Sequence, residues 1–259
     1  MNVRPLANSG LLVRRSVTRI LRQPANIVFA FAFPLLLLAV NSGGLDAATD
    51  IPGFPTDSYL TFALAVPFVQ GALFAALSAG QNFGEDIESG FLSRLALTPL
   101  SRTSLLAGQL AGAVALGIFQ AAIFLAVGEA AGATFEAGAA GIPVLLALSI
   151  LITLGFGSLG ALAALRTGSG EAVQGMFPLF FVFLFLSSMA LPRDLIQHQW
   201  FQTIATYNPV SYLLEAIRSL LITGWDAEAL ALGFACAAGI AVAGILASSA
   251  SLRARMVRT

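Results

Sequence analysis

The chain has 259 residues, of which 58% are hydrophobic and 10% are charged, and its mean hydropathy is +0.87. Soluble domains contain roughly 45–50% apolar residues, so the composition indicates an integral membrane protein and excludes an ordinary soluble domain. The 13 basic and 13 acidic residues cancel, which gives no indication of a nucleic-acid partner. The single cysteine, Cys236, excludes an internal disulfide.

Residues 11–22, with the sequence LLVRRSVTRILR, form the first predicted element. At 100° per residue the basic residues fall on one side of a helix, and apolar residues such as Val17 and Ile20 fall on the other. This pattern is typical of an amphipathic helix that lies in the membrane interface. Attraction to anionic lipid explains the basic face, and so does contact with a cytoplasmic partner. The basic residues are Arg14, Arg15, Arg19 and Arg22.

Six apolar segments are long enough to cross a membrane, because a hydrocarbon core about 30 Å thick needs roughly 20 apolar helical residues. They predict an all-α integral membrane protein with six transmembrane helices. Pro67 is expected to kink the second of these helices. The expected spans are residues 26–42, 58–82, 104–127, 142–165, 172–190 and 227–250.

The middle of the expected spans contains few polar side chains. No Asp, Glu, His or Arg lies near the centre of any span, which disfavours a carrier that is coupled to protons or sodium ions. Gln70 and Gln120 are the main polar residues at this depth. They either form hydrogen bonds between helices or line a translocation path.

Residues 83–102, FGEDIESGFLSRLALTPLSR, form a charged segment between the second and third spans. Ile87, Phe91 and Leu95 recur every four residues, which predicts one face of a short helix that ends at Thr98 and Pro99. Acidic residues at its start suit the helix dipole, so local stabilisation is one explanation, and a surface for a partner protein is the other. The remaining charged candidates are Glu85, Asp86, Glu88 and Arg94.

Residues 192–222, between the fifth and sixth spans, are too polar for a lipid-facing helix and too apolar for a free loop. Pro192 and Pro209 are expected to break this segment. We therefore predict short amphipathic helices that dip back into the outer leaflet, shielded by protein or by a water-filled cavity. His198, the only histidine, lies in this segment and is expected to be an ordinary surface residue.

The arginines indicate the orientation of the chain. With the amino terminus inside, only Arg193 and Arg218 fall outside, and the positive-inside rule then places both termini in the cytoplasm. The other eleven are Arg4, Arg14, Arg15, Arg19, Arg22, Arg94, Arg102, Arg166, Arg253, Arg255 and Arg258. The chain contains no lysine, so it has no phosphate-binding loop of the Walker type, which requires one.

Two segments resemble the ABC exporter permeases of the second type, a family that includes the daunorubicin-resistance permeases. The first, residues 84–112, contains most of the charged segment, and the second, residues 190–224, contains the predicted re-entrant helices. The span count, the internal termini and the basic entry helix agree with this family, so the resemblance covers nearly the whole chain. In the second segment it rests on Asn208, Pro209, Glu215 and Arg218.

The resemblance implies that residues 1–259 form a single transmembrane domain and one half of an exporter. Two copies would form the translocation path in a bacterial plasma membrane, and a separate ATPase subunit would bind ATP and Mg beneath each. This chain would bind no cofactor or metal itself. Residues 83–102 would be the coupling helix that docks into the ATPase, and residues 11–22 would flank it.

The cargo and the activity leave alternatives open. A hydrophobic or amphipathic drug-like substrate fits the apolar spans, and a polysaccharide or lipid-linked glycan is the alternative cargo within the same class. A membrane-embedded enzyme that modifies lipids is an alternative from another class. Such an enzyme needs a convergent set of acid, base, nucleophile or metal ligands, which the sequence does not indicate.

Overall fold

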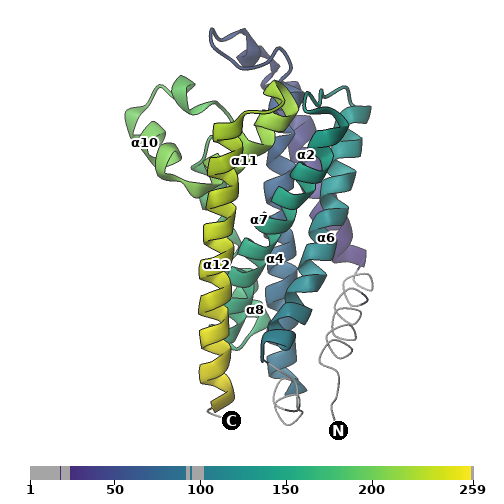
Figure 1. The fold of residues 1–259 in the computed structure, drawn as a ribbon, viewed down its shortest axis with the longest axis vertical. Coiled ribbons are helices and arrows are strands. Elements are labelled where there is room, and N and C mark those ends of the chain that lie inside the picture. Colours follow the sequence, from purple (N-terminus) through teal and green to yellow (C-terminus); the bar gives the residue numbers. More distant parts are fainter. Residues whose placement is uncertain (1–17, 19–23, 92–93, 95–101, 258–259) are drawn as a thin grey trace.

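The computed structural model describes residue 18 and residues 24–91, 94 and 102–257 (Figure 1). Within these residues every regular element is a helix, and no strand occurs. The predicted interfacial helix at 11–22, with its four arginines, lies outside the described residues except for Thr18. Residues 95–101 of the predicted coupling segment, including Leu95, also lie outside them.

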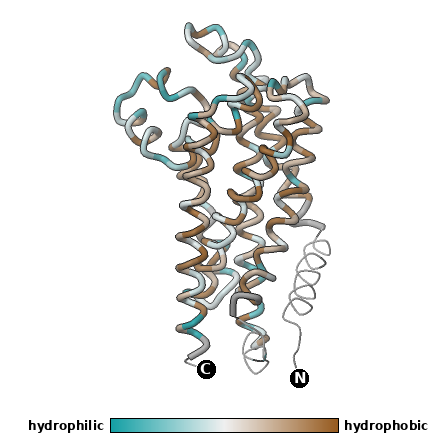
Figure 2. The backbone as a smooth tube through the Cα atoms, viewed as in Figure 1, coloured by the Kyte–Doolittle hydropathy of each residue, from teal (hydrophilic) through white to brown (hydrophobic). Residues whose placement is uncertain are grey.

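Four long helices run along the molecule, and by length and composition each can cross a membrane. We call the end where α4 and α12 end and α6 begins the base, and the opposite end the top. Figure 2 shows hydrophobic residues along these helices and hydrophilic residues concentrated toward the two ends. The four helices are α4 (Ala65–Glu88), which is preceded by the short α3 (Tyr59–Ala63), α6 (Arg102–Ala130), α7 (Gly138–Thr167) and α12 (Ala227–Val257).

The central helix of this bundle is α4. In the segment formed by α3 and α4, 94% of the apolar window is buried, and α7 is the main neighbour of α4. A Cβ atom at Gly80 of α4 would lie 2.8 Å from the carbonyl oxygen of Gly160 of α7. The two backbones therefore meet because neither residue has a side chain, and α4 and α7 form one tightly packed unit.

Two shorter apolar segments accompany the four long helices. One is α2 (Pro24–Gly44), and the other consists of α8 (Gly170–Gly175) and α9 (Phe177–Phe185). The expected continuous helix over 172–190 is therefore wrong, because the helix is interrupted at Met176 and ends at Phe185. The physical reason for the interruption is Pro178, which lacks an amide hydrogen and cannot extend the hydrogen bonds of α8.

The helix expected to kink at Pro67 is broken three residues before this proline. Helices α3 and α4 are separated at Leu64. Pro67 has no N–H group to bond the carbonyl of Ala63, which is the last residue of α3. The second predicted span thus consists of a short entry helix and one long helix.

Short helices cover the top of the bundle. The predicted breaks at two prolines are confirmed, because η2 follows Pro192 and α11 begins at Pro209. Helix α11 packs against α12 and α4, whereas α10 projects to one side (Figure 1). These short elements are η1 (Asp46–Asp50), η2 (Arg193–Leu195), α10 (Gln199–Tyr207), α11 (Pro209–Arg218) and η3 (Ser219–Thr223).

Candidate functional site

The base of α4 is connected to two other helices by acidic side chains of the predicted coupling segment. Asp86 is only 2% exposed, and its carboxylate accepts a hydrogen bond of 2.5 Å from the side-chain amide of Gln109 in α6. Glu88 accepts a hydrogen bond of 3.1 Å from the backbone N–H of Gly170, the first residue of α8. The last turn of α4 therefore contacts both α6 and the start of α8 through polar bonds.

Gly84 brings the start of α8 against α4. A Cβ atom at Gly84 would lie 2.6 Å from the Cα atom of Gly170, so any side chain at this position would push the two segments apart. The close approach places the Glu88 carboxylate at the amino-terminal end of α8, where N–H groups lack helical partners and the helix dipole favours negative charge. Glu88 thus acts as a cap from a different helix.

The helix after this junction differs from the prediction. Helix α4 continues into the charged segment and ends at Glu88, and Gly90 has a φ of 67°, a conformation that glycine adopts readily. Ile87 and Phe91 therefore do not share one helical face, so the face expected from the four-residue spacing is interrupted. Helical conformation resumes at Phe91, and the Arg94 guanidinium donates a hydrogen bond of 3.3 Å to the Ser89 carbonyl.

The described side chains of the segment fall into two groups. Glu85, Glu88 and Arg94 are exposed and Phe91 is half-buried, whereas Asp86 is buried in the bundle. A protein that binds at the base can reach the first group directly. Asp86 instead holds α4 to α6, which gives its charge a role inside the fold.

A second cluster of charges lies at the top, around the predicted re-entrant region. Arg218, at the end of α11, is 6% exposed, and its guanidinium lies 3.5 Å from the centroid of the Phe62 ring. It donates hydrogen bonds to the carbonyls of Phe62 (3.0 Å), Ser188 (2.6 Å) and Met189 (2.7 Å). One buried cation therefore joins α11 to α3 and to the segment after α9.

Glu215 connects this buried cation to the surface. Its carboxylate forms an ion pair with Arg193 and accepts a hydrogen bond of 3.3 Å from the Ser188 hydroxyl. Burial raises the pKa of the Glu215 carboxyl, and the positive charge of Arg193 opposes this shift. Burial also lowers the pKa of Arg218 to about 9, against the effect of Glu215, which still leaves Arg218 charged at neutral pH.

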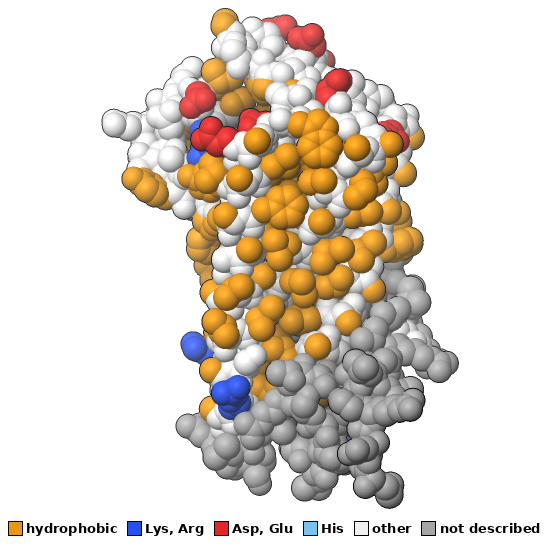
Figure 3. Space-filling view, in the orientation of Figure 1, with side chains coloured by type: hydrophobic (Ala, Val, Ile, Leu, Met, Phe, Trp, Pro, Cys, Tyr) orange, Lys and Arg blue, Asp and Glu red, His pale blue; other side chains and the backbone are white. Residues whose placement is uncertain are grey.

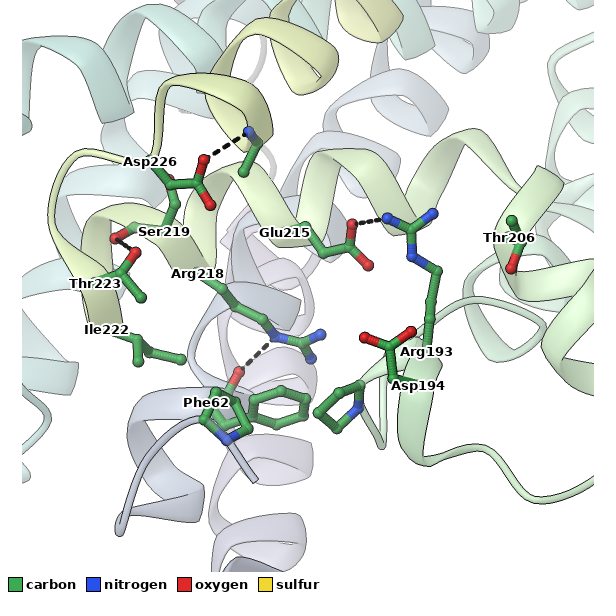
Figure 4. A pocket seen from close by; sticks show the side chains of 13 residues that line it. Phe62, Arg193, Asp194, Thr206, Glu215, Arg218, Ser219, Ile222, Thr223 and Asp226 are labelled. Carbon is green, nitrogen blue, oxygen red and sulfur yellow. Dashed lines mark hydrogen bonds and ion pairs between the residues drawn. The ribbon is translucent and has the colours of Figure 1, made fainter. Parts of the chain in front are cut away.

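A cavity of about 520 Å³ lies beside these charges. Figure 4 shows the paired Arg193 and Glu215 side chains pointing toward each other at the cavity, with Arg218 and Phe62 beside them. Asp194 and Asp226 also line the cavity. The cavity combines an aromatic face with charges of both signs, so its chemistry suits an amphipathic or polar group better than a purely apolar one.

Asn208 and Pro209 begin α11. The Asn208 side chain caps the helix by accepting a hydrogen bond of 2.9 Å from the Val210 N–H, and it also donates one of 2.6 Å to the Phe183 carbonyl near the end of α9. Pro209 occupies the first position of the helix, where its missing N–H group costs nothing. This dipeptide fixes the start of α11 against α9.

The two mid-span glutamines occupy different environments. Gln120 donates a hydrogen bond of 3.2 Å to the carbonyl of Ala30, the residue whose helical partner would be the missing N–H group of Pro34. Gln120 therefore compensates for a proline in α2. Gln70 is fully buried, and neither of its side-chain polar atoms has a hydrogen-bond partner among the described residues.

Sequence reasoning missed the partners of these site residues. Gln109 and Gly170 lie in expected spans or turns and carry no motif, so only the fold reveals that they contact Asp86 and Glu88. Arg193 had one usable signal, because it is one of two arginines expected on the outer side. An isolated cation in that position suggests an acidic partner, which is Glu215.

Comparison with known proteins gives one family. The model of the ABC-2 type transporter matches residues 8–222. A transport permease named ycf38 from Porphyra purpurea is 30% identical over 219 residues, which cover 83% of this chain and 74% of the relative. The corresponding protein from Pyropia yezoensis is 29% identical over 212 residues, covering 81% and 72%.

A bacterial relative carries a more specific name. A doxorubicin-resistance ABC transporter permease, DrrC from Mycobacterium tuberculosis, is 24% identical over 225 residues, which cover 85% of this chain and 78% of the relative. The family match includes both the junction at the base and the charged cluster at the top. The chain belongs to the ABC-2 type transporter family of membrane permeases.

Proposed function

We propose that the chain is the membrane subunit of an ATP-driven exporter in a bacterial plasma membrane, with its base in the cytoplasm. Its six spans would be α2, the α3–α4 segment, α6, α7, the α8–α9 segment and α12. A separate ATPase subunit that binds ATP and Mg would dock at the base. A second copy of the chain would complete the translocation path, and substrate would leave by alternating access.

The observation that carries this proposal is the junction at the base of α4. Glu85 and Arg94 are exposed and Phe91 is half-buried at the base, while Asp86 and Glu88 connect the same turn to α6 and α8. A partner that moves this turn would pull on the third and fifth spans at once. Such a connection is what a subunit without its own energy source requires.

The charges of the described residues support the orientation. Arg94, Arg166, Arg253 and Arg255 follow or end helices at the base, and Arg193 and Arg218 lie at the top. Acidic residues occur at both ends and are more numerous at the top. Figure 3 shows, on one face, basic groups near the base and most acidic groups above the hydrophobic belt, with one basic patch among them. Cytoplasmic loops carry an excess of arginine and lysine, so this arrangement favours a cytoplasmic base.

We propose a hydrophobic or amphipathic, drug-like substrate. The name of the Mycobacterium tuberculosis relative supports this cargo, and so does the top cavity, which offers an aromatic ring beside charged groups. Export of a polysaccharide or lipid-linked glycan is the alternative within the same family, and accumulation of labelled compounds in inverted vesicles would distinguish the two.

The first experiment tests docking. We expect the chain to copurify with an ABC ATPase and to stimulate its ATP hydrolysis. Glu85→Arg and Phe91→Ala should each weaken copurification while permease abundance in the membrane stays normal, because like charges and lost aromatic anchors weaken interfaces. Asp86 is unsuitable for this test, since it is buried. Normal copurification of both variants would contradict docking at this segment.

The second experiment tests coupling. Glu88→Ala removes the bond to the Gly170 N–H and should reduce permease-stimulated ATP hydrolysis and export without loss of copurification. Glu88→Gln keeps an acceptor oxygen and should retain most of the activity. The matched control is Glu171→Ala, which removes an exposed acidic residue from the first turn of α8. Equal effects of Glu88→Ala and Glu171→Ala would show that the link between the helices does not transmit motion.

A further inference from the structure

A long apolar groove runs between α6 and α12, with α7 as its floor. It encloses about 550 Å³, a size typical of a small-molecule site. Helices α6 and α12 each pack on α7, which lies between them in Figure 1. The α6 wall runs from Leu106 to Ile118, the floor includes Ile150 and Leu154, and the α12 wall consists of Ile245 and Ser249.

The groove occupies the half of the bundle that is nearer the base. Leu106 lies one turn after the start of α6, and at 1.5 Å per residue the wall from there to Ile118 is about 18 Å long. Half of a hydrocarbon core is about 15 Å thick. One acyl chain in the leaflet at the base therefore matches the groove in length and in chemistry.

One arginine, Arg253, lies at the basal end of the groove. Ile245, Ser249 and Arg253 follow one another at intervals of four along α12, so they share one face. Arg253 is exposed, and its side chain has no hydrogen bond or ion pair with any described residue. The amino terminus of α6 lies at the same end, and helix amino termini favour anions.

We infer that this groove is a binding site for one anionic phospholipid, with an acyl chain between α6 and α12 and the phosphate beside Arg253. The hydrophobic effect contributes little to such binding, because the chain leaves a bilayer that is equally apolar. Selectivity must then come from the headgroup, and one arginine near the membrane surface favours an anionic over a zwitterionic lipid by about fivefold.

The inference needs only the membrane location, so it is tested separately from export. The purified chain is placed in nanodiscs that contain equal parts of phosphatidylglycerol and phosphatidylcholine, extracted, and weighed by native mass spectrometry. We expect one retained phosphatidylglycerol per chain, with about a fivefold preference over phosphatidylcholine. Arg253→Gln should abolish the preference, and Ala111→Phe, which fills the groove, should abolish retention of both lipids.

Two matched controls separate the site from general effects. Arg166→Gln removes another exposed arginine at the base of α7, on the side of that helix turned away from Ile150 and Leu154. Ala243→Phe adds the same bulk as Ala111→Phe to an exposed position of α12 outside the groove. Both should retain phosphatidylglycerol normally.

Three outcomes would overturn the inference. The first is equal retention of lipid in Ala111→Phe and Ala243→Phe, and the second is an unchanged preference in Arg253→Gln. The third is loss of a second copy of the chain, rather than of lipid, from the Ala111→Phe sample. That result would make the groove an interface between two copies.

Discussion

Pro34 and Gln120 provide a direct test of how α2 is held in the bundle. The change is Gln120→Leu, which removes the hydrogen bond from the side-chain amide to the Ala30 carbonyl. Ala30 is buried at 3% exposure, so its carbonyl would lose its donor without gaining water. A buried acceptor left unpaired costs about 1–3 kcal/mol, and measured interhelical bonds in membranes average about 0.6 kcal/mol.

We expect Gln120→Leu to lower the free energy of unfolding by about 1 kcal/mol, which lies between the mean for interhelical bonds and the full cost of an unpaired buried acceptor. Leucine also removes the side-chain oxygen of Gln120, which has no hydrogen-bond partner within the described ranges, and this offsets part of the loss. For a chain of this size, about 1 kcal/mol corresponds to a fall in Tm of roughly 2–4 °C.

The decisive variant is the double substitution Pro34→Ala with Gln120→Leu. Alanine at position 34 supplies the N–H group that α2 lacks opposite Ala30, so Gln120 is no longer needed. We expect Gln120→Leu to cost little in this background, which gives a coupling energy of about 1 kcal/mol between the two positions. The measurement is the Tm in one detergent of the original chain, the two single variants and the double variant.

Two results would refute this reasoning. In the first, Gln120→Leu lowers the free energy of unfolding equally in the original chain and in the Pro34→Ala background. The two residues would then act independently. Loss of export without loss of stability would instead assign Gln120 to the translocation path. Gln70→Leu is the control, because Gln70 is buried and its side chain has no hydrogen-bond partner in the described part of the chain. We expect this change to leave Tm unchanged or to raise it.

Three further predictions follow from the packing and from the proposed orientation. Arg218→Lys should lower Tm by roughly 4–8 °C, because an ammonium group cannot reach three carbonyls as a guanidinium does; an unchanged Tm would contradict this role. Gly84→Ala should reduce folded protein in the membrane, whereas Gly239→Ala, with open space around it, should not. In a cysteine-free background, Ala47→Cys should react with an impermeant external thiol reagent in sealed cells, and Ser251→Cys should not. The reverse pattern would overturn the proposed orientation.

The long elements of the fold are predictable from the sequence because each depends on local hydropathy. The four long helices agree with expected spans, and the breaks at Pro192 and Pro209 follow from backbone chemistry alone. The fifth span was harder, since its phenylalanine-rich run conceals the interruption at Met176. Hydropathy averages over such a break, whereas the missing N–H group of Pro178 acts on a single turn.

The contacts of the candidate site could not be predicted in the same way. Glu88 bonds Gly170 across 82 positions of sequence and Arg218 bonds Phe62 across 156, so both contacts depend on how the helices pack. The helical face expected for Ile87 and Phe91 failed for a local reason, because Gly90 takes a left-handed conformation that spacing does not reveal. Charge type was informative where charges are rare, as for Arg193 and Glu215.

One buried segment connects the two charged regions of the molecule. Its base end contacts α6 and α8 through Asp86 and Glu88, and at its top end Arg218 bonds the Phe62 carbonyl just before the break at Leu64. Because α4 packs backbone to backbone against α7, it cannot slide alone, and a force applied at the base must move the pair together. The only break between α3 and α4 is at Leu64, at the top of this pair. If an ATPase docks at the base as proposed, a force applied there would be carried along α4 and α7 toward the cavity beside Arg193 and Glu215.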